Sequence, residues 1–349
     1  MCFMQNSKWI YWVWILLILS CSKDADTSVA ETYKPTPYFF NIPAGFPLAK
    51  MIPENPLTVE GVELGKILYS DPVLSTNGRS CSSCHNREKS FSLPLFYGAN
   101  GYKISVPPHI NLAFKRNYNW TGSERILDTL CMGDFGPEFF NTDSAALYAS
   151  LSGNNFYSQR LYKAFLIKDV YQLSFTDLKR KLAYAITQYM RTIISNNAKY
   201  DKVMRGEAEF TEQEQEGRHI FFSEIGDCFH CHQAPLFSDN DFHNNGISSI
   251  FMGFDAGRWL ITQSSADIGK FATPTLRNIA LTAPYMHDGR FSNLTEVVEF
   301  YNSGIHASAT IDPILNKRAP TYQLNLTNEQ KLALIAFLNT LTDVVVLQP

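Results

Sequence analysis

Two stretches with helical spacing of apolar residues precede two cysteine pairs, and this order predicts a helical protein built twice. The stretches are ELGKILYS at 63–70 and EGRHIFFS at 216–223, each close before its pair of cysteines. Longer helices are predicted at 178–194 and 326–341, after the loop-rich segment that follows each pair. The order helix, cysteine motif, loops and closing helix therefore occurs twice, and the expected fold class is mainly α.

Capping signals support two of these helices. A Thr-x-x-Glu capping pair begins at Thr211, and a Thr-x-x-Gln pair begins at Thr327. The segment 196–210 separates the two repeats. We therefore expect an N-terminal domain over 53–204 and a C-terminal domain over 205–345.

The N-terminus has the pattern of an export signal. Lys8 precedes the apolar run IYWVWILLIL, which is short for a membrane span, so a signal peptide is predicted at 1–20. The letters ILSC resemble a bacterial lipobox, in which Cys21 becomes the lipidated first residue. A plain signal peptide cut nearby and an uncleaved anchor are the alternatives. The polar stretch 21–52 is predicted to be a tether and extension.

These features predict an exported lipoprotein that touches a membrane only through its lipid anchor. A periplasm-facing position is expected, and exposure on the surface of an outer membrane fits the same signal. The net charge of −3 and the pI of about 6.2 give no basic surface, which argues against a nucleic-acid partner.

The cysteines leave no pair for a disulfide. Of the seven, Cys2 departs with the signal, Cys21 is the lipidation site, and four stand in the two motifs, so that only Cys131 remains. An exported chain with this count needs another use for its paired thiols.

The motif CSSCH at 81–85 recurs as CFHCH at 228–232, and C-x-x-C-H is the attachment signature of a c-type haem. Each pair of thiols binds the porphyrin, and the histidines His85 and His232 are the expected proximal iron ligands. A redox dithiol or a four-cysteine zinc site would leave both histidines unexplained. The attachment residues are Cys81, Cys84, Cys228 and Cys231. Two cytochrome c-like domains, each with one covalently bound haem, are therefore predicted.

The chain at this point resembles the bacterial di-haem cytochrome c peroxidases and their MauG-type relatives. The resemblance extends from about 53 to 343 and is most specific at LGKILYSDPVLS, at LFSDNDFHNNG and at TPTLRNIALTAPYMHDGRFSNLTEVVEFY, residues 273–301. It implies one haem open to peroxide in the N-terminal domain and one electron-transfer haem in the C-terminal domain.

Tyr301 is the distal ligand of the second haem that the resemblance implies. Peroxidases of the family place Met at this position, fourteen residues after His287 here, and MauG-type proteins place Tyr. Phenolate favours ferric iron, whereas thioether favours ferrous iron. A low-potential second haem is expected. An ordinary aromatic of the helix is the alternative.

The first haem departs from the peroxidase pattern in its loop. Peroxidases of the family carry a blocking His after the first motif, and the segment 86–108 contains no His. An open distal site without reductive activation is therefore expected. His109 is the nearest candidate blocker.

The resemblance also implies an acid/base group and an aromatic bridge between the haems. Glu138, in FGPEF, matches the acid/base position, and Trp120, in YNWTG, matches the bridge. Thr121 replaces the Asp that follows the Trp in the family. A solvated carboxylate and simple core packing are the respective alternatives.

A calcium ion between the domains is a further implication. Its backbone ligands would be the carbonyls of Thr282 and Pro284, while the Asn ligand of the family aligns with Ser105, a poorer ligand. Three other residues of the same motif fit better as haem-propionate or structural partners, namely Arg277, His287 and Arg290.

Three functions follow from these observations. The first is a peroxidase that reduces hydrogen peroxide to water at the N-terminal haem, with electrons passed through the C-terminal haem from a small cytochrome or copper protein. The second is a MauG-like oxidase that uses a peroxide-generated high-valent di-haem state to oxidise a protein or organic substrate. The third is a non-catalytic electron-transfer cytochrome. A homodimer is compatible with each.

Overall fold

The computed structural model describes residue 1 and residues 33–98 and 101–344, so nearly all of the predicted signal peptide, and Cys21, lie outside the described residues. The compact body that begins at Pro35 is mainly helical. Among the described residues, no helix combines the length and the apolar character that crossing a membrane requires.

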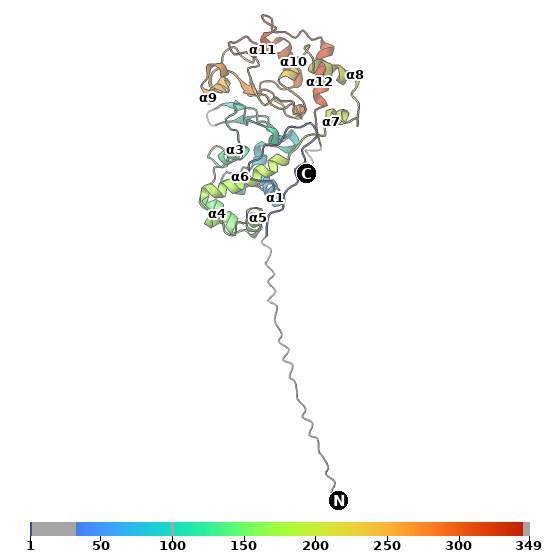
Figure 1. Cartoon of the computed structure of the whole chain (residues 1–349). Helices are drawn as coiled ribbons and strands as arrows, with labels where there is room; N and C mark the ends of the chain where they lie inside the picture. Colours follow the sequence, from blue (N-terminus) through green and yellow to red (C-terminus); the bar gives the residue numbers. More distant parts are fainter. Residues whose placement is uncertain (2–32, 99–100, 345–349) are drawn as a thin grey trace. The chain divides into compact units, whose positions relative to one another are not determined.

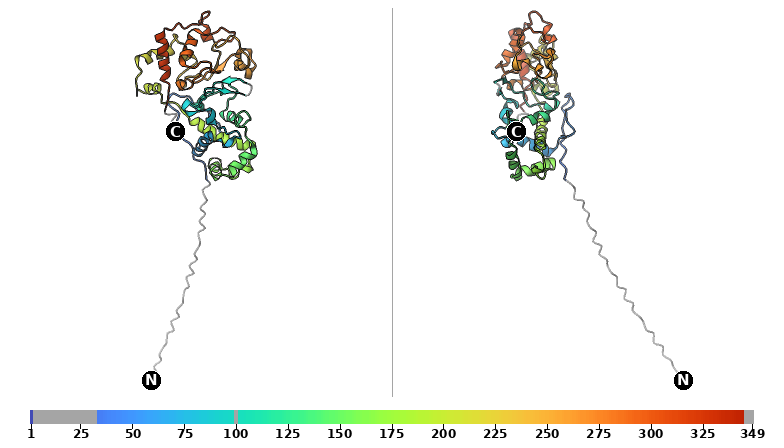
Figure 2. Two further views of the ribbon diagram at one scale, coloured as in Figure 1. Left: turned by 180° about the vertical axis from the view of Figure 1, so that it is seen from behind. Right: turned by 90° about the vertical axis from the view of Figure 1, so that its left-hand side faces the viewer.

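The helices gather in two groups, one coloured blue to green and one yellow to red (Figures 1 and 2). The first group contains α1 (Val59–Ser70), α2 (Cys81–Cys84), α3 (Leu127–Gly133), α4 (Ser144–Ser152), α5 (Asn155–Phe165) and α6 (Phe175–Thr192). The second contains α7 (Lys199–Met204), α8 (Glu212–Phe221), α9 (Trp259–Thr262), α10 (Leu294–Ser303), α11 (Pro313–Asn316) and α12 (Asn328–Asn339). Two short antiparallel pairs complete the fold, β1 (Phe96–Tyr97) with β2 (Lys103–Ile104) and β3 (Phe242–His243) with β4 (Phe271–Ala272).

The four helices expected from apolar spacing are confirmed as α1, α6, α8 and α12. Both capping boxes are confirmed as well, since the hydroxyls of Thr211 and Thr327 each accept a hydrogen bond from the backbone N–H three residues later, at 3.2 Å. The first loop-rich segment nevertheless contains α4 and α5. In α4 the sequence SAALYASLS has no clear apolar stripe, so its helix was not evident from spacing.

Helices α1 and α6 cross in direct backbone contact. A Cβ atom added at Gly65 of α1 would lie 1.9 Å from the carbonyl oxygen of Ala185 and 3.0 Å from the Cβ of Tyr189. Only glycine therefore permits this crossing.

Helices α8 and α12 repeat the same crossing in the second half. A Cβ atom at Gly217 would lie 1.9 Å from the carbonyl oxygen of Ala333 and 2.9 Å from the Cβ of Phe337. In both pairs, the glycine faces a carbonyl oxygen of the other helix and the Cβ atom of the residue four positions later. The two halves of the chain therefore have the same helix packing.

The loops after each cysteine motif repeat too. The hydroxyl of Tyr118 donates to the carbonyl oxygen of Leu112 at 3.2 Å, and the hydroxyl of Tyr285 donates to that of Ile279 at 3.0 Å. In both cases the acceptor begins a short 3₁₀ helix that follows a left-handed asparagine. Trp120 and His287 each come two positions after the tyrosine and therefore occupy equivalent places in the two halves.

Two hydrophobic clusters form the core. The first draws its buried side chains from residues 64–193 and the second from residues 200–341. The change of cluster falls within 193–200, beside the predicted domain boundary. Two haem domains agree with this division, and the exact domain limits remain a prediction.

The predicted tether is packed against the body in its last part. The ring of Phe46 meets the ring of Phe114 edge-on at 5.2 Å, and the backbone N–H of Lys50 donates to the carbonyl oxygen of Ala113 at 2.6 Å. The hydroxyl of Thr36 donates to Glu60 of α1 at 2.9 Å. The extension is thus part of the fold from about residue 35 onward.

Candidate haem centres

The first motif lies on the single turn of α2, which presents its histidine with a fixed orientation. Nδ1 of His85 lies 2.9 Å from the carbonyl oxygen of Phe91, so this nitrogen is the donor and Nε2 is left for a metal. Phe91 holds the left-handed φ of +57° that turns its carbonyl toward the ring. Burial lowers the pKa of His85 to about 4, which keeps the imidazole neutral, as iron ligation requires.

The second motif repeats this arrangement on a 3₁₀ turn, Cys228–His230. Nδ1 of His232 lies 3.1 Å from the carbonyl oxygen of Phe237, whose φ is +52°. Burial lowers the pKa of His232 as well. Both histidines thus have Nδ1 held by a backbone carbonyl, the arrangement that orients a metal-binding imidazole.

A cavity of about 230 Å³ opens beside the second motif. Its wall contains the thiols of Cys228 and Cys231, the imidazole of His232 and the ring of Tyr301, and most of the remaining lining is aliphatic or aromatic. Burial raises the pKa of Tyr301 to about 12. Two thiols, one imidazole nitrogen and an apolar wall are the donor set and surroundings that a c-type haem needs, so these residues fit the group.

The four motif cysteines form no disulfide, so their sulfur atoms can form bonds to haem. The remaining described cysteine, Cys131, is buried in the first core cluster and is also a free thiol. The cysteine chemistry of the described chain therefore agrees with two attachment sites and with no disulfide.

Trp120 reaches from the first half into the second. It lines the cavity of the second motif, and its indole N–H donates to the carbonyl oxygen of Ser105 at 2.7 Å. Its own carbonyl oxygen accepts a bond from the backbone N–H of Ala272 in β4 at 2.8 Å. The residue is thus held by one bond from each half, the first through its indole and the second through its backbone carbonyl.

The three motif residues expected to be structural or propionate partners have protein partners. Arg277 is fully buried and pairs with both carboxylate oxygens of Asp201 at 2.8 Å. The ring of His287 stacks on Phe271 with centroids 3.9 Å apart and bonds Asp255 at 2.8 Å. Arg290 pairs with the neighbouring carboxylate of residue 288.

Glu138 lies on an exposed turn close to the first motif. Its backbone carbonyl accepts a hydrogen bond from Arg79, two residues before the motif, at 3.0 Å. Its carboxylate accepts a bond from the hydroxyl of Tyr102 at 3.0 Å. Burial, and then the bond to Glu138, raise the pKa of Tyr102. The chain after the motif therefore folds back as the β1–β2 hairpin and touches the predicted acid/base group.

His109 lies beside His85 and not opposite it. The two rings are stacked, with centroids 3.4 Å apart and planes at 20°, and Nδ1 of His109 is 3.1 Å from the hydroxyl of Tyr69. A side chain that blocked an iron held by His85 would have to face Nε2 across that iron. His109 instead contacts the face of the His85 ring.

Comparison with known proteins decides the family. The family model for the di-haem cytochrome c peroxidases matches residues 59–209. The cytochrome-c peroxidase IdrP2 of Denitromonas iodatirespirans is 32% identical over 320 residues, which cover 80% of this chain and 81% of that protein. The chain belongs to the di-haem cytochrome c peroxidase family. It is accordingly an oxidoreductase of the cytochrome-c peroxidase type, and the family implies haem c as its cofactor.

Relatives of the MauG type match at a similar level. The methylamine utilization protein MauG of Methylorubrum extorquens is 29% identical, with 82% of this chain and 79% of that protein covered. A crystal structure of a MauG-like protein associated with microbial copper homeostasis superposes with a TM-score of 0.80 and 28% identity, over 89% of this chain and 97% of that chain. The di-haem peroxidase BthA of Burkholderia thailandensis, at 21% identity and a TM-score of 0.67, shares the fold.

The inter-domain position that holds calcium in the resemblance is bridged here by a hydrogen bond. The hydroxyl of Ser105 donates to the carbonyl oxygen of Pro284 at 3.2 Å. The backbone N–H of Ser105 donates to the carbonyl oxygen of His287 at 2.8 Å. The hydroxyl of Ser105 thus occupies the carbonyl oxygen of Pro284, which would otherwise face a calcium ion. The oxygen atoms at this position therefore fit calcium poorly.

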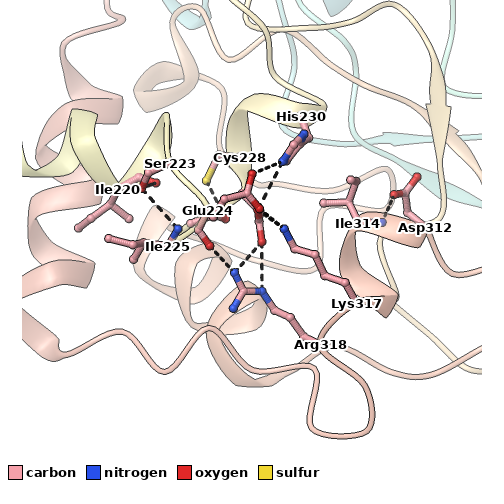
Figure 3. A network of polar contacts seen from close by, with 12 residues as sticks. Ile220, Ser223, Glu224, Ile225, Cys228, His230, Asp312, Ile314, Lys317 and Arg318 are labelled. Atoms are coloured by element: carbon pink, nitrogen blue, oxygen red, sulfur yellow. Dashed lines mark hydrogen bonds and ion pairs between the residues drawn. The ribbon is translucent and has the colours of Figure 1, made fainter.

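A charged network that includes Glu224, Lys317 and Arg318 lies next to the second motif and reaches its inner histidine, His230 (Figure 3). Asp227, directly before the motif, pairs with Lys317 and Arg318 at 2.6 Å each, and its side chain is 3% exposed. Glu224 pairs with Lys317 and lies 3.1 Å from Nε2 of His230. The inner histidine of CFHCH is therefore engaged in this network, which ties the segment after α11 to the haem motif.

Two polar side chains next to the predicted site residues were not predicted. Asn245 donates to the hydroxyl of Tyr301 at 3.2 Å, and Tyr102 donates to Glu138. Asn245 stands in the family-like segment LFSDNDFHNNG, which was the one available signal. Tyr102 gave none, because its contact depends on a hairpin that places it beside a residue 36 positions later.

Proposed function

We propose that the protein reduces hydrogen peroxide to water at an N-terminal haem, with electrons passed through a C-terminal haem from a small cytochrome c or copper protein. The observation that carries this proposal is the pair of equivalent motifs, each with a histidine whose Nδ1 bonds a backbone carbonyl. When bound, each haem supplies a redox-active iron. Family membership supports the peroxide substrate.

The residues divide the work by position. His85 and His232 would each hold one haem iron, and Tyr301, whose oxygen is held by Asn245, would be a second protein ligand of the iron at His232. Trp120 lies between the two halves and passes electrons, which its fixed position supports. Glu138 moves a proton from the near oxygen of peroxide to the leaving oxygen.

A MauG-like oxidase is the second candidate, because specific observations favour it. The tyrosine at 301 lies in the cavity wall beside the second motif, and His109 stacks on the ring of His85. Both observations favour the MauG type over a peroxidase that needs reductive activation. In this function, peroxide supplies two oxidising equivalents, and the two electrons that balance them are drawn from a protein or organic substrate.

Export, lipidation at Cys21 and a periplasm-facing lipid anchor belong to the same proposal, as does a homodimer. Export is supported by the signal-like N-terminal sequence. Calcium at the carbonyls of Thr282 and Pro284 is the weakest part of the resemblance, since Ser105 already bonds one of the two carbonyls.

The deciding experiment is stopped-flow spectroscopy of the fully ferric protein mixed with one equivalent of hydrogen peroxide and no reductant. A fast change of the Soret band that involves both haems supports the open first haem and the MauG-like alternative. Reaction only after half-reduction by a donor supports a reductively activated peroxidase. If neither the ferric nor the half-reduced protein reacts with peroxide, both catalytic functions are contradicted. The remaining function is then non-catalytic electron transfer.

A further inference from the structure

The cavity beside the second motif contains another side chain able to bind iron. Met286 and Tyr301 both line this cavity, together with His232. A thioether sulfur is an established axial ligand of c-type haem. Met286 lies in the segment 273–301 that resembles the family, but that resemblance implies no function for it.

One amide group holds both candidate ligand atoms. Nδ2 of Asn245 lies 3.2 Å from the hydroxyl oxygen of Tyr301 and 3.5 Å from the sulfur of Met286. A primary amide has two N–H donors, so it can bond both at once. Because both contacts end on the same nitrogen, oxygen and sulfur are no farther apart than the two distances together.

The backbone at Met286 is held in an unfavourable conformation. Its φ is +70°, in the left-handed region that a long side chain rarely occupies. The equivalent position in the first half is Asn119, with φ +62°, and asparagine tolerates this region well. Strain of this kind persists where the surrounding structure enforces it, and it is concentrated at ligand-binding positions.

We propose that Met286 is a second iron ligand of the C-terminal haem and replaces Tyr301 when that haem is reduced. The inference rests on the proposed function, in which Tyr301 binds the ferric iron. Phenolate is a hard anionic donor that favours ferric iron, and thioether favours ferrous iron. The two ligands are therefore matched to the two oxidation states.

The exchange is balanced in atoms and electrons. One electron enters from the small redox protein that serves as donor, the bond between iron and the oxygen of Tyr301 breaks, and a bond to the sulfur of Met286 forms. The released phenolate takes one proton from solvent and keeps the hydrogen bond from Asn245. A haem with this exchange holds its electron longer than a tyrosine-ligated haem would.

The test compares spin states in the reduced protein, by resonance Raman and magnetic circular dichroism spectroscopy. In the native protein, one of the two ferrous haems is expected to be low-spin. In Met286→Leu, this low-spin signal is expected to disappear while the ferric spectrum stays unchanged. Met252→Leu is the control, because this methionine is 76% exposed in the same half. A reduced Met286→Leu protein that keeps its low-spin haem overturns the proposal.

If Met286→Leu does not take up two haems, the variant Tyr301→Phe tests whether Met286 can bind the iron. In Tyr301→Phe, the ferric second haem is expected to show the near-infrared charge-transfer band of methionine ligation. A five-coordinate high-spin haem in this variant overturns the proposal. Failure of the proposed function is visible separately, as a native ferric protein without the phenolate signature.

Discussion

Tyr301 is the residue on which the potential of the second haem is expected to depend most. Replacing it with Met exchanges an anionic oxygen for a thioether, which stabilises the ferrous state. Axial ligands tune haem potentials within a range of about 0.8 V, and we expect Tyr301→Met to raise the potential by roughly 0.1 V or more. Spectroelectrochemical titration measures the change. An unchanged potential would show that the tyrosine does not bind iron.

Glu138 is the residue expected to control the rate of reaction with peroxide. Glu138→Gln keeps the size of the side chain and its acceptor oxygen for Tyr102 but removes the proton-transfer group. The second-order rate constant is expected to fall roughly 100-fold if the carboxylate is the acid/base. Glu209→Gln, at an exposed position, is the matched control. A rate equal to that of the control would remove Glu138 from the mechanism.

The cysteines and histidines of the two motifs were accessible to sequence reasoning because haem attachment demands a fixed local spacing. The two C-x-x-C-H motifs needed only five consecutive positions. Tyr102 and Asn245 were not accessible, since their roles depend on hydrogen bonds to residues 36 and 56 positions away. Contacts of this kind arise from tertiary packing, which a local pattern does not encode.

At the scale of secondary-structure elements, the two helix crossings are expected to limit stability. Gly65→Ala and Gly217→Ala each introduce a methyl group where a backbone carbonyl oxygen lies 1.9 Å away. Overpacking of this kind typically costs about 1–3 kcal/mol, because helices must move apart. Chemical denaturation of the haem-loaded protein measures the free energy of unfolding.

Gly133→Ala provides the comparison for these variants. Gly133 ends α3, and no atom lies within 4 Å of an added Cβ atom. An alanine there is expected to be neutral or slightly stabilising. Equal effects of all three substitutions would show that backbone contact at the crossings is not the cause.

Long helices with helical spacing of apolar residues were predictable, as α6, α8 and α12 demonstrate, and capping boxes marked the starts of α8 and α12. Short elements were not. Several 3₁₀ turns follow a left-handed residue, Asp227 and Asn278 among them. Phe91 and Phe237 are left-handed as well, and their φ values cannot be inferred from residue type. Helix α4 could not be predicted from spacing, because its alanines and serines form no periodic pattern of apolar residues.

At the scale of the whole molecule, the hydrogen bond from Ser105 to Pro284 is expected to make the junction independent of calcium. Addition of EGTA should leave the Tm of the haem-loaded protein unchanged. Ser105→Ala removes the hydroxyl donor and should lower the free energy of unfolding by about 0.5–1.5 kcal/mol. A Tm that falls with EGTA and recovers with added calcium would contradict this expectation.

The two-fold repeat was predictable as an order of elements, but its spatial consequences were not. Sequence placed a haem motif and a closing helix in each half. It could not show that Trp120 lies in the cavity of the other half, because strand β4 and the loop at Ser105 must first fold around it.

The double attachment of Trp120 has a kinetic consequence. Electron tunnelling weakens steeply as the gap between donor and acceptor widens, so domains that rock against each other give rates that vary with viscosity. Here the indole bonds the first half and the backbone carbonyl of the same residue bonds the second. Two short hydrogen bonds fix the position of Trp120 between the halves. If electrons pass through this residue, as proposed, the rate of transfer should be the same in dilute buffer and in a crowded compartment.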